Sequence, residues 1–253
     1  ESGNPGEVAQ VGAAGDISIF SFGRSKVISA VNGGLVAVNN PALAGPVRLA
    51  AEMLQPAARG RTVQNLLHIP VTSLAKTFYW SPLGKLVMLV SQKLHLINLE
   101  VTPAEKQSRR PHYFISRLPN AMARLGLAQL AKLDRFNLSR RKAAQNYFDH
   151  LSVAAGPDPS AHPGAIFLRY PLQVANPRQV LRQAKKQGVI LGDWYSVPVA
   201  PCDVDASKTG YVPGSCPHCE SANARMINLP THPALTTADL RRIVKIINQY
   251  AEN

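Results

Sequence analysis

The chain has 253 residues, of which 45% are hydrophobic and 17% are charged, a composition typical of a globular protein with a sizeable core. Lys and Arg outnumber Asp and Glu by 28 to 15, which gives a formal net charge of +13. The longest apolar stretch, residues 81–99, is interrupted by Lys85, Lys93 and His95, so no membrane-spanning helix is expected. Residues 1–16 lack the basic and apolar segments of an export signal. We therefore expect a cytoplasmic protein without a membrane partner.

Basic residues concentrate in three short segments, 106–110, 139–142 and 182–186. Only 6% of the residues are aromatic, which leaves few side chains on which nucleic-acid bases could stack. We interpret the basic segments as solvated helix faces rather than a nucleic-acid footprint. The positive charge also suits an anionic small-molecule substrate.

The three cysteines do not form a metal-binding pattern. Cys216 and Cys219 make a single CxxC pair, and no second pair stands at the spacing of a zinc ribbon. His218 and His232 lie near, but a lone CxxC in a loop is weak evidence. We expect no metal ion.

The first two predicted strands lie on either side of Lys26 in the sequence. Residues 17–22 and 35–38 are short β-branched and aromatic runs, which predict two buried strands. Lys26 lies between them, so we expect it on a loop at a strand edge. Residues 39–54 predict a turn that leads into a helix, and residues 81–94 predict an amphipathic helix.

A long helical pattern and a compact α/β pattern follow. Residues 119–151 predict a helix that begins at Pro119, and the Pro- and Gly-rich segment 154–165 predicts a domain junction. Strands are expected in 165–174 and 189–192, with a helix between them that Asn176 caps and Gly188 ends. Thr236 opens the last helix, with Asp239 placed for a capping box. Helices that alternate with short strands predict a layered α/β or α+β architecture.

From the residues alone, two roles are open for Lys26. An exposed loop lysine is common, and the local sequence lacks the spacing of a phosphate-binding P-loop. An amine that forms a Schiff base must be held at a fixed point near groups that neutralise an anionic cofactor. Hydroxyls at Ser21 and Ser29 and flexible glycines at Gly33 and Gly34 would suit that role.

Three ordered segments resemble one family. Residues 15–41, "GDISIFSFGRSKVISAVNGGLVAVNNP", resemble the Schiff-base segment of the DegT/StrS family of pyridoxal-phosphate-dependent sugar aminotransferases. Residues 116–147 are similar to the family's long interdomain helix, and residues 210–244, with Leu-Pro-x-His-Pro before the last helix, resemble its C-terminal segment. The likeness runs from about residue 13 to the end of the chain.

The resemblance implies the α/β architecture of fold-type-I pyridoxal-phosphate (PLP) dependent transferases, with an incomplete large domain and a small C-terminal α/β domain. It assigns residues 1–118 to the large cofactor-binding domain, 119–155 to the long linking helix and 156–253 to the small domain. In the family, an aromatic that stacks on the cofactor ring and an acid that pairs with its ring nitrogen precede the lysine segment. We therefore expect this chain to begin in mid-fold, and its activity on its own to be doubtful.

The resemblance also places site residues. Lys26 would form the Schiff base and Ser21 would bind the cofactor phosphate. Arg117 would reach the phosphate of a neighbouring subunit's cofactor, although Ile115 stands where many members carry an asparagine. The segments that flank the substrate contain Trp194, Tyr195 and His232, for which packing is the alternative role.

The implied reaction is transfer of an amino group from a donor such as glutamate to a nucleotide-linked keto sugar, in a homodimer that serves nucleotide-sugar and polysaccharide biosynthesis. Two alternatives stay open. One is a PLP-dependent sugar dehydratase of the same fold, but that branch replaces the lysine with histidine. The other is a non-catalytic, basic binding protein, which would bind polyanions in a salt-sensitive manner.

Overall fold

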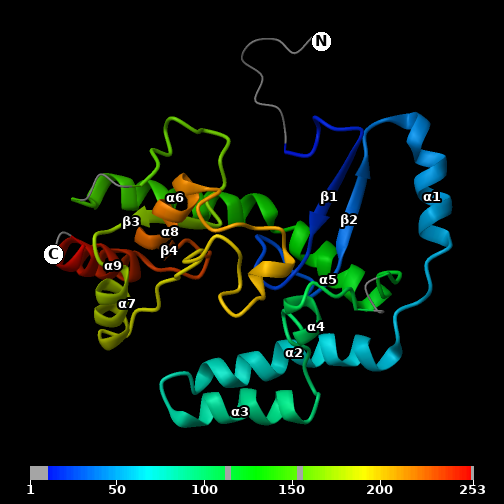
Figure 1. Ribbon diagram of the computed structural model, residues 1–253, viewed down its shortest axis with the longest axis horizontal. Helices are drawn as coiled ribbons and strands as arrows, with labels where there is room; N and C mark the ends of the chain where they lie inside the picture. Colours follow the sequence, from blue (N-terminus) through cyan, green and yellow to red (C-terminus); the bar gives the residue numbers. More distant parts are fainter. Residues whose placement is uncertain (1–10, 112–114, 153–155, 252–253) are drawn as a thin grey trace. The chain divides into compact units, whose positions relative to one another are not determined.

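The computed structural model describes residues 11–111, 115–152 and 156–251 (Figure 1). The chain divides into two compact units. The N-terminal unit comprises residues 1–105 and 110–132, and the C-terminal unit comprises residues 106–109 and 133–253. The division at Lys132 and Leu133 falls within residues 119–155, the segment expected to link two domains.

The N-terminal unit is mostly helical. Its elements are β1 (Ile17–Ser21), β2 (Gly34–Val38), the 3-10 helix η1 (Pro41–Leu43), α1 (Ala44–Glu52), α2 (Arg59–Thr77), α3 (Pro82–Lys93), α4 (Pro103–Lys106, whose last residue is grouped with the other unit) and α5 (Asn120–Leu130). The helix predicted over residues 81–94 is confirmed as α3, and the turn and helix predicted over 39–54 are η1 and α1. Helices α2 and α3 contact each other side by side (Figure 1).

Strands β1 and β2 form an antiparallel pair in which Ile17 lies opposite Val38 and Ser21 opposite Gly34. Their positions confirm the two predicted strands, but the prediction that they are buried is wrong for this chain. The side chain of Ile19 is 81% exposed and that of Val36 is 50% exposed. A sheet face is buried only when another layer packs against it, and the described residues leave these side chains uncovered.

The buried part of this region is the connection between the two strands. Its ends are closed by hydrogen bonds from the Phe22 amide to the Gly33 carbonyl oxygen, at 2.9 Å, and from the Ala30 amide to the Phe22 carbonyl oxygen, at 3.0 Å. Gly126 of α5 lies against this loop, and a Cβ there would be 3.6 Å from the Phe22 ring and 3.9 Å from the Ala30 Cβ. Helix α5 therefore packs closely against the connection and supports it.

The linking helix expected over residues 119–155 is two helices, α5 and α6 (Leu133–His150). At the break, the Lys132 amide donates to the Gln129 carbonyl oxygen three residues earlier, which tightens the backbone as in a 3-10 turn. The two helices are buried in different cores, since Met122 of α5 belongs to one unit and Tyr147 of α6 to the other.

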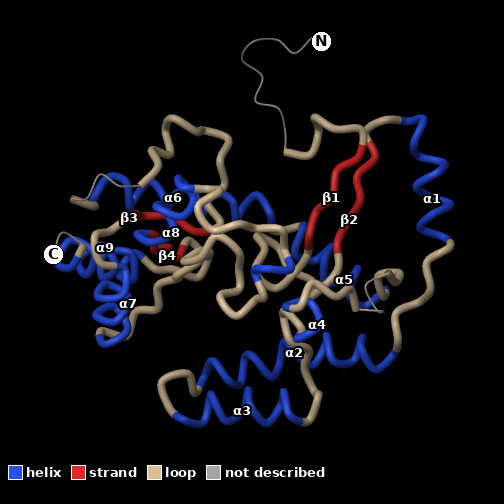
Figure 2. Tube along the Cα trace, viewed as in Figure 1, coloured by secondary structure: helices blue, strands red, loops and turns tan. Residues whose placement is uncertain are grey.

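The C-terminal unit is a small α/β layer structure. After α6 come β3 (Arg169–Gln173), α7 (Pro177–Lys186), the 3-10 helix η3 (Ala206–Lys208), α8 (Pro217–Arg225), β4 (Met226–Pro230) and α9 (Thr237–Tyr250). Strands β3 and β4 pair antiparallel, and the helices α6, α7 and α9 pack around them (Figure 2). The fully buried side chains at the centre include Tyr147, Tyr170, Leu172, Ile227, Leu229, Ile246 and Ile247.

Local signals located the helix ends of this unit correctly. The Asn176 side chain accepts from the Gln179 amide at 3.1 Å, Gly188 has φ +71°, and Thr236 and Asp239 form a capping box. The strand predicted at 189–192 is wrong, because only Gly192 pairs, with Asn228 beside the sheet. Its apolar run instead contributes the buried Val189 to the core.

Candidate functional site

Lys26 lies in the turn that follows β1, on the connection that α5 supports. Its side chain is exposed, and its amide donates to the Gly23 carbonyl oxygen at 3.2 Å. Further along the same loop, the buried Val31 has φ +68°, a conformation that β-branched residues rarely adopt. Backbone strain of this kind costs on the order of 1–3 kcal/mol and is concentrated at functional sites. The loop is thus closed at its ends and strained near Asn32, while Lys26 stays accessible.

Ser21 ends β1 and faces the same loop. Its hydroxyl oxygen accepts a hydrogen bond from the Gly23 amide at 3.2 Å, which leaves the hydroxyl proton able to donate to an anion. Ser21 is paired with Gly34, where a Cβ would come within 2.7 Å of the Phe20 carbonyl oxygen. Because glycine has no Cβ, the two strands can approach this closely at the end of the pair.

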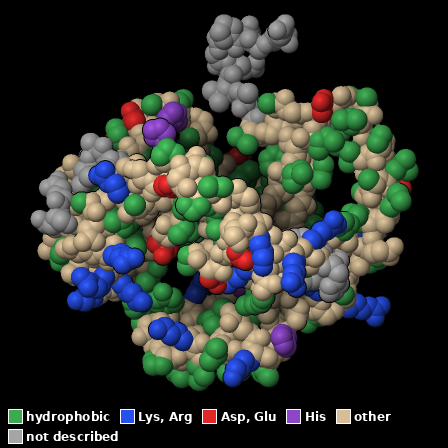
Figure 3. Space-filling model, in the orientation of Figure 1, with side chains coloured by type: hydrophobic (Ala, Val, Ile, Leu, Met, Phe, Trp, Pro, Cys, Tyr) green, Lys and Arg blue, Asp and Glu red, His purple; other side chains and the backbone are tan. Residues whose placement is uncertain are grey.

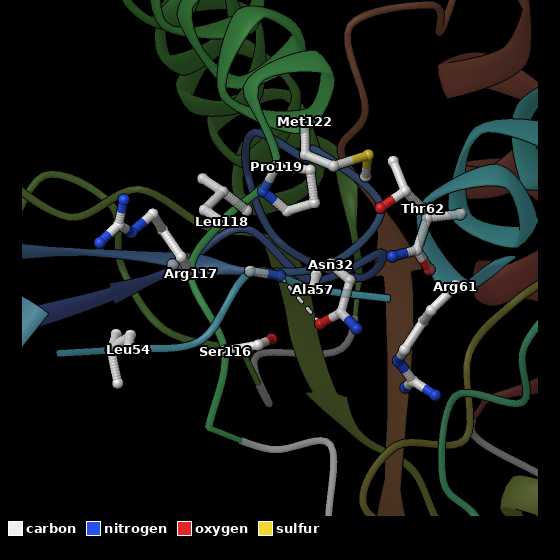
Figure 4. A pocket seen from close by; sticks show the side chains of 13 residues that line it. Asn32, Leu54, Ala57, Arg61, Thr62, Ser116, Arg117, Leu118, Pro119 and Met122 are labelled. Atoms are coloured by element: carbon white, nitrogen blue, oxygen red, sulfur yellow. Dashed lines mark hydrogen bonds between the residues drawn. The ribbon is translucent and has the colours of Figure 1, made fainter. Parts of the chain in front are cut away.

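A cavity of about 390 Å³ opens at the other end of the same loop (Figure 4). Asn32, Gly33 and Gly34 form one wall, Arg61 and Thr62 of α2 a second, and residues 116–119 a third. Figure 4 shows Arg61 and Arg117 on different sides of this space. Two guanidinium groups around a cavity are suited to bind a phosphate or carboxylate group. Lys26 is outside the lining, on the same loop as Asn32–Gly34.

Arg117 is fixed at the end of α1. Its amide donates to the Gln55 carbonyl oxygen at 2.8 Å, and its guanidinium Nη2 donates to the Glu52 carbonyl oxygen at 2.8 Å. The residue remains exposed. The hydrogen bond to Glu52 fixes the guanidinium plane, and the other N–H groups remain available as donors. Arg117 can therefore combine a positioning contact within its own unit with contact to an anion.

Arg24, two residues before Lys26 on the same loop, has charged and ionisable neighbours. Burial lowers the pKa of Arg24, and nearby Arg61 lowers it further, whereas Glu100 opposes the change. Burial also lowers the pKa of His68 to about 4, with contributions from the positive charges of Arg24 and Lys76. His68 is thus neutral at pH 7, and the positive charge around Arg24 comes from that residue and Arg61.

The other residues expected at the site belong to the C-terminal unit. The guanidinium of Arg169 lies 4.5 Å from the centre of the Trp194 ring, and the Asn228 side-chain amide donates to the Trp194 carbonyl oxygen. Trp194 is 42% exposed and Tyr195 58% exposed, and their ring centres are 5.7 Å apart. Trp194 thus packs beside the β3–β4 sheet while both rings keep accessible surface.

His232 follows β4 and precedes α9. The pKa of the Asp239 carboxyl is lowered chiefly by hydrogen bonds from Thr236, and the charge of His232 lowers it further. His232 therefore lies near the start of α9. Ser21, Lys26 and Arg117 belong to the N-terminal unit, and Trp194, Tyr195 and His232 belong to the C-terminal unit.

Sequence reasoning missed Arg24, Arg61 and His68. Arg61 stands 35 positions after Lys26 in a helix without a recognisable motif, so no local pattern marks it as a neighbour of the loop. Among the described residues, no group of three or more His, Cys, Asp and Glu side chains could hold a metal ion. Cys202, Cys216 and Cys219 are free and exposed.

These groups fit the cofactor that the resemblance implies. PLP combines a carbonyl group with a phosphate dianion, which require an amine and hydrogen-bond donors or cations, respectively. Lys26 supplies an accessible amine, Ser21 a hydroxyl, and Arg61 and Arg117 guanidinium groups beside a cavity. The donor set is therefore of the right chemical kind.

Comparison with known proteins agrees with this fit. The chain is similar to an aminotransferase from Brucella abortus (20% identity, TM-score 0.61), to S. venezuelae DesV in complex with a ketimine intermediate (19%, 0.61), and to Helicobacter pylori PseC, an aminotransferase involved in pseudoaminic acid biosynthesis (17%, 0.59). At these identities the likeness concerns the fold, and it confirms fold-type-I transferase architecture. No curated protein matches the chain.

The matches to the solved structures cover 96%, 95% and 96% of this chain but only 52%, 53% and 55% of those chains. The chain thus spans about half the length of these structures. The sequence profile described as the DegT/DnrJ/EryC1/StrS aminotransferase family matches residues 4–69 and 92–248. The chain belongs to the DegT/DnrJ/EryC1/StrS aminotransferase family.

Proposed function

We propose that this chain provides the lysine segment and the small domain of a PLP-dependent sugar aminotransferase, with Lys26 as the residue that binds the cofactor covalently. One observation carries the proposal. The loop that holds Lys26 begins at Ser21 and ends at Asn32–Gly34, which form the wall of a cavity that Arg61 and Arg117 also line. The loop thus carries the amine and begins at the hydroxyl, and two cations line the cavity at its far end.

Each of these residues has a separate role in the proposal. The Lys26 amine would hold the cofactor at its carbonyl carbon, the Ser21 hydroxyl would bind the phosphate of that cofactor, and the Arg117 guanidinium would bind the phosphate of the other subunit's cofactor. When bound, the cofactor stabilises the negative charge that develops at the donor's Cα. The Nζ atom of Lys26, released when the donor binds, would take the proton from the donor's Cα as a base and then give it up as an acid.

The substrate we propose is a keto sugar carried on a nucleotide diphosphate, with glutamate as the amino donor. The net charge of +13 and the arginines around the cavity favour an anionic substrate. Trp194 and Tyr195 offer aromatic surface for a sugar or base in the C-terminal unit. We further propose a homodimer, in which Arg117 contacts the cofactor of the other subunit.

The test is a single-turnover assay with the protein as its gene encodes it, loaded with PLP. We expect glutamate to be converted to 2-oxoglutarate, and a nucleotide-linked keto sugar then to yield an amino sugar that mass spectrometry detects. The variant Lys26→Ala should abolish both half-reactions, whereas Lys208→Ala, at an exposed lysine in the C-terminal unit, should retain them. Release of water from the sugar without transfer of nitrogen would instead indicate the dehydratase.

A further inference from the structure

Helices α2 and α3 form a helical hairpin (residues 59–93) that presents large apolar side chains outward. At its tip, Phe78, Tyr79 and Trp80 are 39%, 47% and 61% exposed. Along α3, Leu83, Leu86 and Val90 recur at intervals of three and four residues and are 53%, 53% and 42% exposed. These side chains therefore make an apolar stripe that continues into an aromatic tip.

Small residues are among those buried between the two helices of the hairpin. Ala75 of α2 and Gly84 and Ser91 of α3 are buried, and a Cβ on Gly84 would lie 2.6 Å from the carbonyl oxygens of Ala75 and Phe78. A helical hairpin in water normally buries its large apolar side chains between the helices. Here the helices approach closely at Gly84, and leucines of α3 stay exposed, features that also occur where helices pack in lipid.

The charge of this region is of one sign. Between Glu52 and Glu100 the sequence contains no acidic residue, but it contains Arg59, Arg61, Lys76, Lys85 and Lys93. Lys76 and Lys85 lie on either side of the aromatic tip. At the lower edge of the view in Figure 3, hydrophobic, Lys, Arg and His side chains lie among uncharged atoms, and no Asp or Glu is seen there. The complementary partner is therefore an anionic surface that also offers an apolar interior.

The tip of the hairpin and the parts of α2 and α3 next to it lie outside the residues that the family profile matches. The family profile matches residues 4–69 and 92–248, so residues 70–91 fall between the matched ranges. These residues contain the aromatic tip, the outward leucines, and Lys76 and Lys85. The apolar stripe therefore lies in a segment that the family profile does not match.

We propose that the α2–α3 hairpin binds the surface of an anionic phospholipid bilayer. Phe78, Tyr79, Trp80 and the outward leucines insert at the boundary between headgroups and acyl chains, and Lys76, Lys85 and Lys93 contact the headgroup phosphates. Within the described residues, no helix is long and apolar enough to cross a membrane, so the contact is interfacial. The expectation of no membrane partner rested on the lack of a span, and this proposal replaces it.

The test uses the natural reporter at the tip. The chain has two tryptophans, Trp80 and Trp194, so Trp194→Phe leaves Trp80 as the only source of tryptophan fluorescence. We expect its emission to shift to shorter wavelength on addition of vesicles of phosphatidylglycerol and phosphatidylcholine, and to be quenched by brominated acyl chains. Vesicles of phosphatidylcholine alone should produce a much weaker response, since each lysine near an anionic surface contributes about fivefold to partitioning.

Charge variants separate the hairpin from the general basicity of the chain. Lys76→Gln, Lys85→Gln and Lys93→Gln together should weaken vesicle binding by about a hundredfold. The matched control removes the same number of charges from the exposed α7 cations Arg182, Lys185 and Lys186, and it should retain most of the binding. Synthesis in a cell-free system with vesicles present, followed by flotation, gives the same comparison if the purified chain aggregates.

Three results would overturn the proposal. One is equal loss of binding in the two triple variants, which would assign binding to net charge. Another is a Trp80 shift that depends on protein concentration without vesicles, which would show that a second copy covers the stripe. The third is failure of the chain to float with anionic vesicles. All three are independent of the proposed function, because the substituted lysines and Trp80 are not among the residues of the proposed cofactor site.

Discussion

At the scale of single residues, Lys26 and Arg117 differ in how their side chains are held. Lys26 is exposed on a loop that hydrogen bonds close at both ends, so its amine is accessible on a fixed base. Arg117 is held by its backbone and its side chain at the end of α1. The sequence motif identified both residues by resemblance. The structure adds a physical context for each, together with Arg61, which lines the same cavity as Arg117.

The role of Arg117 can be tested by a conservative change. In the protein loaded with PLP, Arg117→Lys should raise the dissociation constant of the cofactor by about tenfold, because lysine cannot reproduce the planar guanidinium contact to a phosphate. Equilibrium dialysis measures this constant. The melting temperature of the cofactor-free protein should change little, since the backbone bond to Gln55 stays. A lower melting temperature with unchanged cofactor affinity would mean that Arg117 serves only to hold α1.

Mixed dimers separate action across subunits from action within one subunit. Subunits carrying Arg117→Ala, mixed with subunits carrying Lys26→Ala, can form a dimer in which one site has both residues intact. We expect part of the activity to return. If subunit exchange is demonstrated and no activity returns, Arg117 acts within its own subunit.

At the scale of elements, the sequence predicts best what depends on neighbouring residues. Asn176, Gly188 and Thr236 mark helix ends because capping is satisfied within a few positions, and the structure confirms all three. Burial of β1 and β2 depends on a distant layer, and there the apolar pattern was misleading. The two residues between α5 and α6 are Ala131 and Lys132. Neither is a proline or glycine, so the local sequence did not predict that the helix would break there.

Packing within the α2–α3 hairpin gives a test at this scale. Gly84→Ala should destabilise the hairpin by about 1–3 kcal/mol, because the new Cβ would meet two backbone carbonyl oxygens that cannot rotate away. Gly60→Ala in α2 is the matched control, since a Cβ there meets nothing within 4 Å. Alanine should there stabilise the helix by about 0.5–1 kcal/mol.

Urea unfolding followed by Trp80 emission, in the Trp194→Phe background, measures both changes. Equal effects of the two substitutions would contradict the close approach of the helices at Gly84.

At the scale of the whole molecule, the chain consists of two units with different degrees of burial. The C-terminal unit has a continuous core around Tyr147, Tyr170 and Ile247, and the N-terminal unit leaves much of β1, β2 and the hairpin exposed. The sequence could predict the family and the candidate lysine, because three motifs stand in order. It could not predict the cavity, because Asn32, Arg61 and Arg117 are brought together only by the packing of distant segments.

The most direct test of the central claim is chemical trapping at the lysine. The protein is mixed with PLP, reduced with borohydride, digested, and mapped by mass spectrometry. We predict that the cofactor mass is found on the peptide that contains Lys26, that Lys26→Ala removes it, and that Ser21→Ala weakens cofactor retention by about 1.5–3 kcal/mol. Labelling of another lysine, or no labelling at all, would contradict the assignment of Lys26 as the cofactor-binding residue.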